Sequence, residues 1–526
     1  MDRIGDSDFS RALSRLAAGV VIVAALCFLL PLTVSSYVET TFIDKQNNAG
    51  ECAVIFRDKL LLNVLVTVVA AAGLYLLSRW ADGIPLRRIE AVLLLWTAAL
   101  GLAFILTTKI STPWYTDSFE LLRAAKAAAE NDFSALEGYS LDVYFVRYPF
   151  QLGFVLYVEL FLRAVTAVVP TMPEGYYFLA LQGVNLLWLL LAYHALIRLS
   201  VLLLDGERSG KRTALLLFLC LPAVLSCTFL YGNIPAFACG TAALWCFASF
   251  LRERRWRDGV LTALLLALAV VLKLNLLIFF AAVLILWCLD LLRRFELRSL
   301  VCFVLCIVTV LGVRSVPQSI YERRSGRSFG DGIPMLAWMA MGFCEGHAGP
   351  GWYKEDNTVT AFYKSGNDSA ATKEHARRVL SERLGDFTDD PAAALEFFST
   401  KLVTQWNEPS YESIWLNQVH ESYGEKGALY GLFCDRGEKG TLAFMNQVQQ
   451  LVFLGTLSAL LRLWRRKDVN ACLPIVVLLG GLLYHLLFEA KSQYALPYYI
   501  LLFPMAAYGW DGALEKLFAG RKKRHE

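Results

Sequence analysis

Apolar segments long enough to cross a lipid bilayer recur from one end of the chain to the other. A helix needs about 20 apolar residues to span a hydrocarbon layer of about 30 Å. Helices of this kind are predicted at residues 16–35, 60–78, 89–107, 177–204, 213–229, 235–251, 258–272, 275–292, 298–315, 443–463, 471–488 and 495–513. Within hydrocarbon, such helices satisfy their own backbone hydrogen bonds. The pattern predicts an all-α polytopic membrane protein with about 12 or 13 transmembrane helices.

The composition excludes a soluble globular protein. Of the 526 residues, 56% are hydrophobic and only 18% are charged, and the mean hydropathy is +0.48. A soluble core of this size would need far more polar surface to cover it. The first apolar segment, residues 16–32, is not closed by a small-residue cleavage site, so we predict a retained helix rather than a signal peptide.

Basic residues gather in the short loops on one side of the predicted helices. With a cytoplasmic N-terminus, the inside segments are 79–88, 205–212, 252–258, 293–298, 462–468 and 516–526, and each of them is basic. The positive-inside rule places such loops in the cytoplasm. We therefore predict a multi-pass plasma-membrane protein with both termini in the cytoplasm.

Residues 149–169 are apolar enough to cross, but a crossing there would move every later basic loop outside. Glu159 and Arg163 interrupt the apolar surface of this segment at helical spacing. That pattern is typical of a helix lying in the membrane interface. The alternative is an extra span with local exceptions to the charge rule.

This topology divides the chain into four parts. Residues 1–88 form additional N-terminal transmembrane helices, and residues 89–315 form a transmembrane core with an outer loop at 108–176. Residues 316–442 form an extracytoplasmic cap, and residues 443–526 form the C-terminal helices and a basic tail. Within the cap, Asp390 and Pro391 are typical of a helix start, so the cap is predicted to be folded.

The outer loop contains the first candidate for chemistry. Asp117 directly follows a predicted spanning helix and begins an alanine-rich helix on the outer face. A carboxylate there can act on a substrate, or it can simply cap the helix through backbone hydrogen bonds. Further along, Arg147 lies between Tyr144 and Tyr148. Its guanidinium can bind a phosphate or extend to lipid headgroups.

Three more cations lie near predicted outer turns. Lys273 interrupts two apolar helices, where insertion of a charge costs about 2.5–3.5 kcal/mol, so a functional role is the default hypothesis. Lys491 lies two residues after Glu489 in another turn, where a mutual ion pair is the simpler explanation. Arg314 ends a helix on the same side. An anionic lipid headgroup is the ligand that these charges favour.

Aromatic residues in the outer regions are candidate substrate contacts. Trp352 lies in a glycine-rich stretch that could shape an acceptor site or form ordinary turns. Trp406 has polar neighbours suited to a sugar, but it also ends an amphipathic helix. Tyr494 follows Lys491, and with Tyr144, Tyr148 and Glu489 it completes the candidate substrate-binding set.

Cysteine and histidine provide no predicted metal site or cofactor site. Nine of the twelve cysteines lie in apolar runs, where they act as small packing residues. Cys52, Cys344 and Cys434 fall in predicted outer loops, and whether Cys344 pairs with Cys434 is left open. The histidines of the cap lack metal-ligand spacing.

The chain resembles the bacterial GT-C glycosyltransferases, the superfamily of protein O-mannosyltransferases and the lipid A aminoarabinose transferase (glycosyltransferase family 39-like). Order and spacing match from about residue 90 to 513. The motifs that carry the resemblance are Asp117, Ala124-Ala125, Asn131-Asp132-Phe133, Tyr144-Phe145-Val146-Arg147-Tyr148-Pro149, the Lys273 turn, and Glu489-Ala490-Lys491-Ser492-Gln493-Tyr494-Ala495-Leu496-Pro497.

The resemblance implies an inverting glycosyltransferase that uses a polyprenyl phosphate donor, such as undecaprenyl phosphate, and an extracytoplasmic acceptor on an envelope glycan, lipid or protein. It implies a catalytic role for Asp117 and donor-phosphate contacts for Arg147 and Lys273, with Lys491 and Arg314 as further candidates. Ser118 and Asn233 stand where many members have acids, which argues against a two-carboxylate or metal-dependent mechanism.

Three alternatives compete with this interpretation, and one of them is a purely structural membrane scaffold, which would not need Lys273 and Arg147 at the depth of lipid phosphates. A transporter or flippase of a lipid-linked or anionic substrate would also place charges within the membrane, although the chain shows no internal repeat and no paired broken helices. A wall-polymer ligase or polymerase with a different membrane fold is the third alternative. The sugar and the acceptor are not specified by the sequence.

Overall fold

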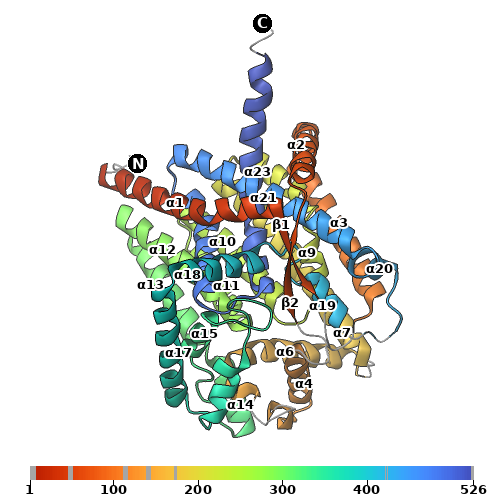
Figure 1. Cartoon of the computed structure of the whole chain (residues 1–526), viewed down its shortest axis with the longest axis vertical. Coiled ribbons are helices and arrows are strands. Elements are labelled where there is room, and N and C mark those ends of the chain that lie inside the picture. The colour runs from red at the N-terminus through yellow and green to blue at the C-terminus, as the bar shows by residue number, and fades with distance from the viewer. Residues whose placement is uncertain are drawn as a thin grey trace.

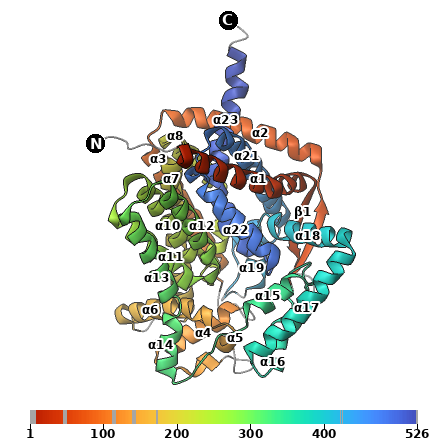
Figure 2. The same cartoon turned by 90° about the vertical axis from the view of Figure 1, so that its left-hand side faces the viewer.

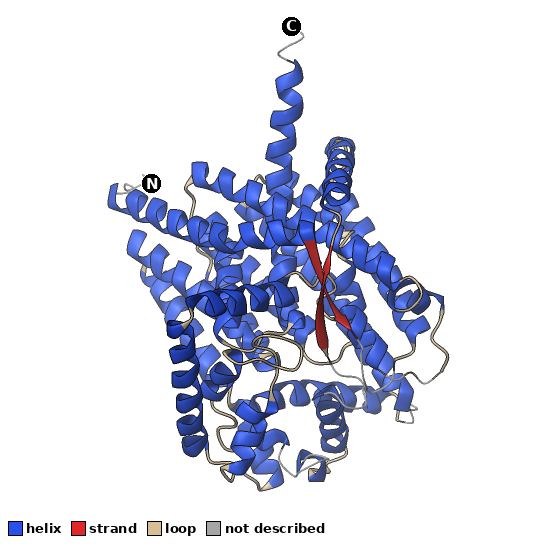
Figure 3. Cartoon of the chain, in the orientation of Figure 1, coloured by secondary structure: helices blue, strands red, loops and turns tan. Residues whose placement is uncertain are grey.

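The computed structural model describes residues 8–44, 51–110, 117–137, 144–170, 174–420, 422 and 424–522. Nearly all of their regular structure is helical (Figure 3), which confirms the predicted all-α class. The N-terminal part contains α1 (Asp8–Val38), β1 (Glu39–Asp44), β2 (Cys52–Arg57), α2 (Leu60–Asp82) and α3 (Leu86–Thr108). The two strands form an antiparallel ladder in which Glu39 lies opposite Arg57.

The remaining helices follow in three groups. The first group is α4 (Asp117–Ala129), α5 (Tyr144–Arg147), α6 (Leu152–Val168), α7 (Glu174–Leu203), α8 (Glu207–Leu217), α9 (Leu221–Leu225), α10 (Asn233–Glu253), α11 (Trp256–Leu272), α12 (Leu277–Arg293) and α13 (Leu297–Val313). The second is α14 (Val316–Ser325), α15 (Met335–Gly342), α16 (Val359–Lys364), α17 (Ser369–Asp389), α18 (Pro391–Trp406), α19 (Ser413–Val419) and α20 (Ala428–Cys434). The third is α21 (Glu438–Arg466), α22 (Leu473–Leu487) and α23 (Ser492–Lys522).

The two long loop regions gather at the same end of the helix bundle. In Figures 1 and 2 the C-terminal half of α23 projects from one end, whereas α4, α6, α14 and α16 lie at the opposite end. We call this opposite end the cap end. α4 and α6 from the first outer region and α14 and α16 from the second, far apart in the sequence, therefore lie together at the cap end.

The described part of the chain has fewer helices long and apolar enough to cross a bilayer than the twelve that the sequence pattern predicts. Among the described residues, nine helices are long and apolar enough to cross a bilayer, or ten if the pair α8–α9, bent by 63°, is one span. The multi-pass character is thereby confirmed. Of the other predicted spans, α11 has only 17 residues, α21 carries buried Asn446, Gln449 and Gln450, and α23 is rich in tyrosine. The count of twelve stays a prediction.

Residues 149–169, which the sequence allows either to cross the membrane or to lie in its interface, contain α6. This helix lies across the cap end rather than along the bundle (Figure 2). By length and composition it could span a membrane. Its two charged residues are used in packing: Glu159 is buried and accepts hydrogen bonds from Tyr321 (2.6 Å) and Arg324 (2.8 Å) of α14, while Arg163 pairs with it at 2.8 Å. This ion-pair network fixes α6 to α14, and the interfacial placement stays a prediction.

All twelve cysteines lie in described segments, and all are free thiols. Cys344 is buried after α15, where its carbonyl accepts from the Gly351 amide at 2.8 Å. Cys434 is buried in a different cluster with Phe104, Leu225 and Met445. The bridge left open between Cys344 and Cys434 is therefore not formed, because the two thiols belong to separately packed regions.

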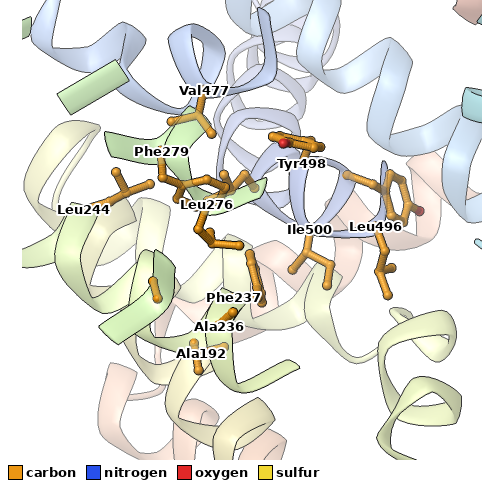
Figure 4. Close-up of a cluster of buried hydrophobic side chains, with 14 of the residues drawn as sticks. Ala192, Ala236, Phe237, Leu244, Leu276, Phe279, Val477, Leu496, Tyr498 and Ile500 are labelled. Atoms are coloured by element: carbon orange, nitrogen blue, oxygen red, sulfur yellow. The ribbon is translucent and has the colours of Figure 1, made fainter. Parts of the chain in front are cut away.

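An apolar core lies where the central helices cross. Figure 4 shows Leu244 of α10, Leu276 and Phe279 at the start of α12, Val477 of α22 and Tyr498 of α23 in one buried cluster. Lipid is as apolar as these side chains, so they stabilise the fold through close van der Waals packing between helices. Leu276 and Phe279 directly follow the turn at Lys273, so this cluster fixes the position of that turn.

A buried lysine attaches the cap to the turn between α22 and α23. The Lys401 ammonium, on α18, donates to three backbone carbonyls: Gly342 at 2.5 Å, Leu486 at 3.0 Å and Phe488 at 2.7 Å. Two of these carbonyls belong to the C-terminal end of α22, where a positive charge is favourable. Lys401 therefore holds residues 486–488 in place directly before Glu489.

We predict that Lys401→Met destabilises the protein, because three buried carbonyls lose their donor. Leaving buried polar groups unsatisfied costs about 1–3 kcal/mol. The thermal unfolding midpoint in detergent should fall clearly, whereas Lys373→Met, at an exposed position of α17, should leave it unchanged. Equal midpoints for both variants would contradict the role assigned to Lys401.

Candidate functional site

Asp117 is the first residue of α4, and its side chain points toward Tyr231, which lies just before α10. Its Oδ2 atom accepts a 2.6 Å hydrogen bond from the Tyr231 hydroxyl, and the Asp117 side chain is exposed. The same hydroxyl accepts a 2.7 Å hydrogen bond from Gln151 Nε2. The carboxylate is therefore oriented by a fixed hydrogen-bond chain and is open to solvent.

Tyr231 also carries the second charged group of the site. The Lys273 ammonium lies 3.3 Å from the centroid of the Tyr231 ring and 5.5 Å from that of Tyr494. A cation over an aromatic face is stabilised by about 2 kcal/mol or more when it is shielded from water. One tyrosine thus joins a carboxylate at its hydroxyl and an ammonium at its ring face.

Burial changes the titration of Lys273. Only 9% of the residue is exposed. Burial lowers the pKa of Lys273 to about 7, while the charges of Asp117 and Glu489 partly oppose that decrease. The ammonium is therefore present below about pH 7 and is lost above it, unless an anion is bound beside it.

Two glycines allow the backbone around Lys273 to pack closely. A Cβ at Gly153, at the start of α6, would lie 1.9 Å from the Val271 carbonyl oxygen. Gly232 has a positive φ of 83°, and a Cβ there would lie 2.6 Å from the Leu272 carbonyl oxygen. No other residue fits in either place without displacing the end of α11. The starts of α6 and α10 are thereby brought against the residues that precede Lys273.

Asp117, Tyr231 and Lys273 together form what we call the cluster. Arg147 is the last residue of α5 and lies near it. Its carbonyl accepts from the Ile333 amide at 3.0 Å, which ties α5 to the segment before α15. Its Nε and Nη2 atoms are buried, with no hydrogen-bond partner among the described residues. A buried guanidinium normally has such partners, so its donors are suited to an anionic ligand.

Tyr144 and Tyr148 lie close enough to Asp117 to be affected by its charge. The rings of Tyr144 and Tyr148 are 4.9 Å apart. Burial raises the pKa of the Tyr144 hydroxyl well above its usual value, and the charge of Asp117 raises it further. The same two causes act on Tyr148. Both hydroxyls therefore stay protonated and can donate hydrogen bonds near the Asp117 carboxylate.

Lys491 has other partners than the predicted one. Its ammonium pairs with Glu51, in the segment leading into β2, and lies 4.0 Å from the buried carboxylate of Glu412. An ion pair with Glu489 was the simpler explanation from sequence, and no such pair is formed among the described residues. Burial acts to lower the pKa of Lys491, but the charges of Glu51, Glu412 and Glu489 raise it overall.

The carboxylates of Glu408 and Glu412 are buried near the ion pair between Lys491 and Glu51. Ser492 Oγ donates to Glu408 at 3.0 Å and to Glu412 at 3.2 Å, and the Gln493 amide donates to Glu412 at 3.2 Å. Burial raises the pKa of both glutamates. Burial also raises the pKa of Glu489 to about 7, although the charge of Lys491 opposes it. Lys491 is thus already neutralised by the protein's own acids.

Three predicted site residues lie apart from the cluster. Arg314 follows α13 with an exposed side chain. Trp352 is 1% exposed and its Nε1 donates to Thr404 at 3.2 Å, while Trp406 is 2% exposed and packs against Tyr498. Both indoles belong to the packed interior, so neither presents a face on which a sugar could stack.

The structure adds site residues that the sequence pattern did not reveal, namely Tyr231, Gln151, Glu51, Glu408 and Glu412. The one local signal was at Tyr231, which precedes Gly232 at a break between helices. Glu51 and Lys491 are 440 positions apart, so no local pattern connects them. Among the described residues, no group of three or more His, Cys, Asp or Glu side chains is placed to hold a metal ion.

No protein-family model and no curated protein matches this chain. Among solved structures, it is similar to the archaeal oligosaccharyltransferase AglB from Archaeoglobus fulgidus in complex with an inhibitory peptide and a dolichol-phosphate, with 11% identity and a TM-score of 0.40. The apo form of the Archaeoglobus fulgidus oligosaccharyltransferase gives 12% identity and a TM-score of 0.43. Each alignment covers 83% of this chain but only about half of the other, 51% and 52%. Likeness at this level leaves the function to be argued from the site.

We predict that Lys491→Met destabilises the protein strongly, because it leaves the carboxylates of Glu51 and Glu412 without their cation. Removing one partner of a buried ion pair costs about 3–5 kcal/mol. Adding Glu51→Gln to this variant should restore part of the loss in the thermal unfolding midpoint. A stable Lys491→Met protein that fails only in ligand binding would instead assign Lys491 to the substrate.

Proposed function

We propose that the chain is an inverting glycosyltransferase that moves a sugar from a polyprenyl phosphate to an acceptor hydroxyl outside the cytoplasm. The observation that carries the proposal is the pairing of Asp117 and Lys273 on Tyr231, with Arg147 nearby. A carboxylate can take a proton, and two cations can receive a phosphate, within one cluster at the cap end. The transfer of a sugar from a lipid phosphate needs both functions.

The bond changes follow from these positions. The acceptor oxygen attacks the anomeric carbon while Asp117 takes the hydroxyl proton as general base. The bond between the anomeric carbon and the phosphate oxygen breaks, and its electron pair remains on the polyprenyl phosphate. Arg147 and Lys273 stabilise the negative charge that develops there. A single displacement inverts the anomeric configuration.

Arg147 and Lys273 are better phosphate ligands than the other cations proposed from sequence. Arg147 has buried nitrogen atoms without hydrogen-bond partners among the described residues. Lys273 has an aromatic neighbour and forms no ion pair within the described part of the chain. Lys491 is neutralised by Glu51 and Glu412, so we assign it to positioning the turn after α22. The donor phosphate would also help Lys273 to keep its proton.

The location of the cluster suits a lipid-linked donor. A polyprenyl phosphate keeps its chain in hydrocarbon and its phosphate at the membrane surface. Lys273 lies in the turn between α11 and α12, two apolar helices, and a turn at the end of such helices suits a phosphate at the membrane surface. We propose a hexosyl or pentosyl group as the sugar that is transferred.

We predict that Asp117→Asn lowers turnover of the cognate polyprenyl-phosphate sugar by about 100- to 10,000-fold, the usual contribution of a general base. Donor binding should survive, because the amide removes only the base. Asp389→Asn, at an exposed position of α17, is the matched control and should keep full activity. The measurement is release of polyprenyl phosphate from a panel of donors in nanodiscs. Full turnover by Asp117→Asn, or no binding of any donor by the wild type, would contradict the proposal.

Donor affinity should decrease as pH rises above about 7, because Lys273 loses its charge there. Protonated lysine falls from about half to about one tenth between pH 7 and 8, so binding should weaken roughly fivefold. Lys273→Arg keeps its charge at both pH values and should remove this dependence. Glu489 also titrates near pH 7, so a decrease that persists in Lys273→Arg would assign the pH dependence to Glu489 instead.

A further inference from the structure

A cavity of about 460 Å³ lies between α4, α6 and the start of α7, outside the proposed catalytic cluster. Its apolar wall includes Leu122 of α4, Leu162 of α6, and Phe178 and Leu181 of α7. A volume of this size is within the range of cavities that hold small ligands, and an apolar wall fits a hydrocarbon chain.

The cavity lies on the opposite face of α4 from the catalytic carboxylate. Successive helical residues are rotated by about 100°, so Leu122 and Lys126 are turned roughly 140–180° from Asp117. Asp117 instead points toward Tyr231. A ligand in the cavity would therefore contact the back of the helix that carries Asp117, not the reacting groups.

Charged groups line the cavity beside its apolar wall. Arg123 and Lys126 contribute two cations and Glu130 contributes one carboxylate, all from α4. Arg123 also contacts Glu120 at 3.0 Å and the Ala135 carbonyl at 3.2 Å. A guanidinium has five donors, so Arg123 can bind a phosphate besides its ion pair with Glu120, and Lys126 lines the same cavity beside the apolar wall.

Another side of α6, turned away from the residues that line the cavity, carries large exposed apolar side chains. Leu160 is 58% exposed and Val168 is 81% exposed. Large apolar side chains with this exposure are suited to hydrocarbon rather than to water. The cavity therefore lies behind a helix whose outer side is suited to lipid.

We propose that this cavity is a phospholipid site. One acyl chain lies against Leu122, Leu162 and Phe178, and the phosphate is bound by Arg123 and Lys126. The bound lipid supports α4 from behind and thereby helps to hold Asp117 in place. The inference concerns lipid binding alone and does not depend on the proposed glycosyltransferase activity.

The test is photo-crosslinking of the full chain in nanodiscs of phosphatidylethanolamine and phosphatidylglycerol that also contain polyprenyl phosphate. A benzophenone amino acid at Phe178 reports on the cavity, and the same probe at Leu160 reports on bulk lipid. The double change Arg123→Gln and Lys126→Gln should reduce phospholipid adducts at position 178 about tenfold, as expected for losing a charge-assisted contact. Adducts at position 160 should not change.

A second variant keeps the test independent of charge effects. Thr166→Trp fills the cavity from α6 and should also remove the adduct at position 178, while the exposed change Arg377→Gln should not. Adducts at position 178 that are unaffected by both cavity variants would overturn the proposal. So would adducts that consist only of polyprenyl phosphate, because the cavity would then hold the donor.

Discussion

A lysine ammonium held between two apolar helices is the constraint on which the site depends. The protein must keep Lys273 in place without surrounding it with water, and it does so with the ring face of Tyr231 at 3.3 Å. The same tyrosine fixes Asp117 through its hydroxyl. Close backbone packing at Gly153 and Gly232 brings these elements together. The carboxylate of Asp117 and the ammonium of Lys273 are therefore positioned by one shared side chain.

A second buried network supports the first and attaches the cap to the turn before α23. Lys491 is neutralised by Glu51 and Glu412, and Lys401 of the cap binds the carbonyls of Leu486 and Phe488. Together they hold the turn that carries Glu489, whose charge acts on Lys273. Contacts from Glu51 before β2 and from Lys401 of the cap thus fix the turn between α22 and α23 that contains Glu489.

Apolar periodicity predicted the helical class, the folded cap and the multi-pass character, because these depend on local composition. Lys273 was indicated by its charge between apolar helices, Asp117 by its place at a helix start after a predicted span, and Arg147 by its aromatic neighbours. The structure brings Asp117 and Lys273 together at Tyr231. The partners of Lys491 could not be predicted, since Glu51 approaches it from the other end of the chain. Trp352 and Trp406 were misleading for a related reason: an aromatic residue beside polar neighbours has the same local pattern in a binding site and in a packed core.

The most direct test of the account is a structure of the protein in nanodiscs with a polyprenyl phosphonate sugar that cannot be cleaved. The account predicts phosphonate density between Arg147 and Lys273, with the anomeric carbon facing the open side of the Asp117 carboxylate. Phosphonate density in the cavity behind α4, or at the end of the bundle from which α23 projects, would contradict it.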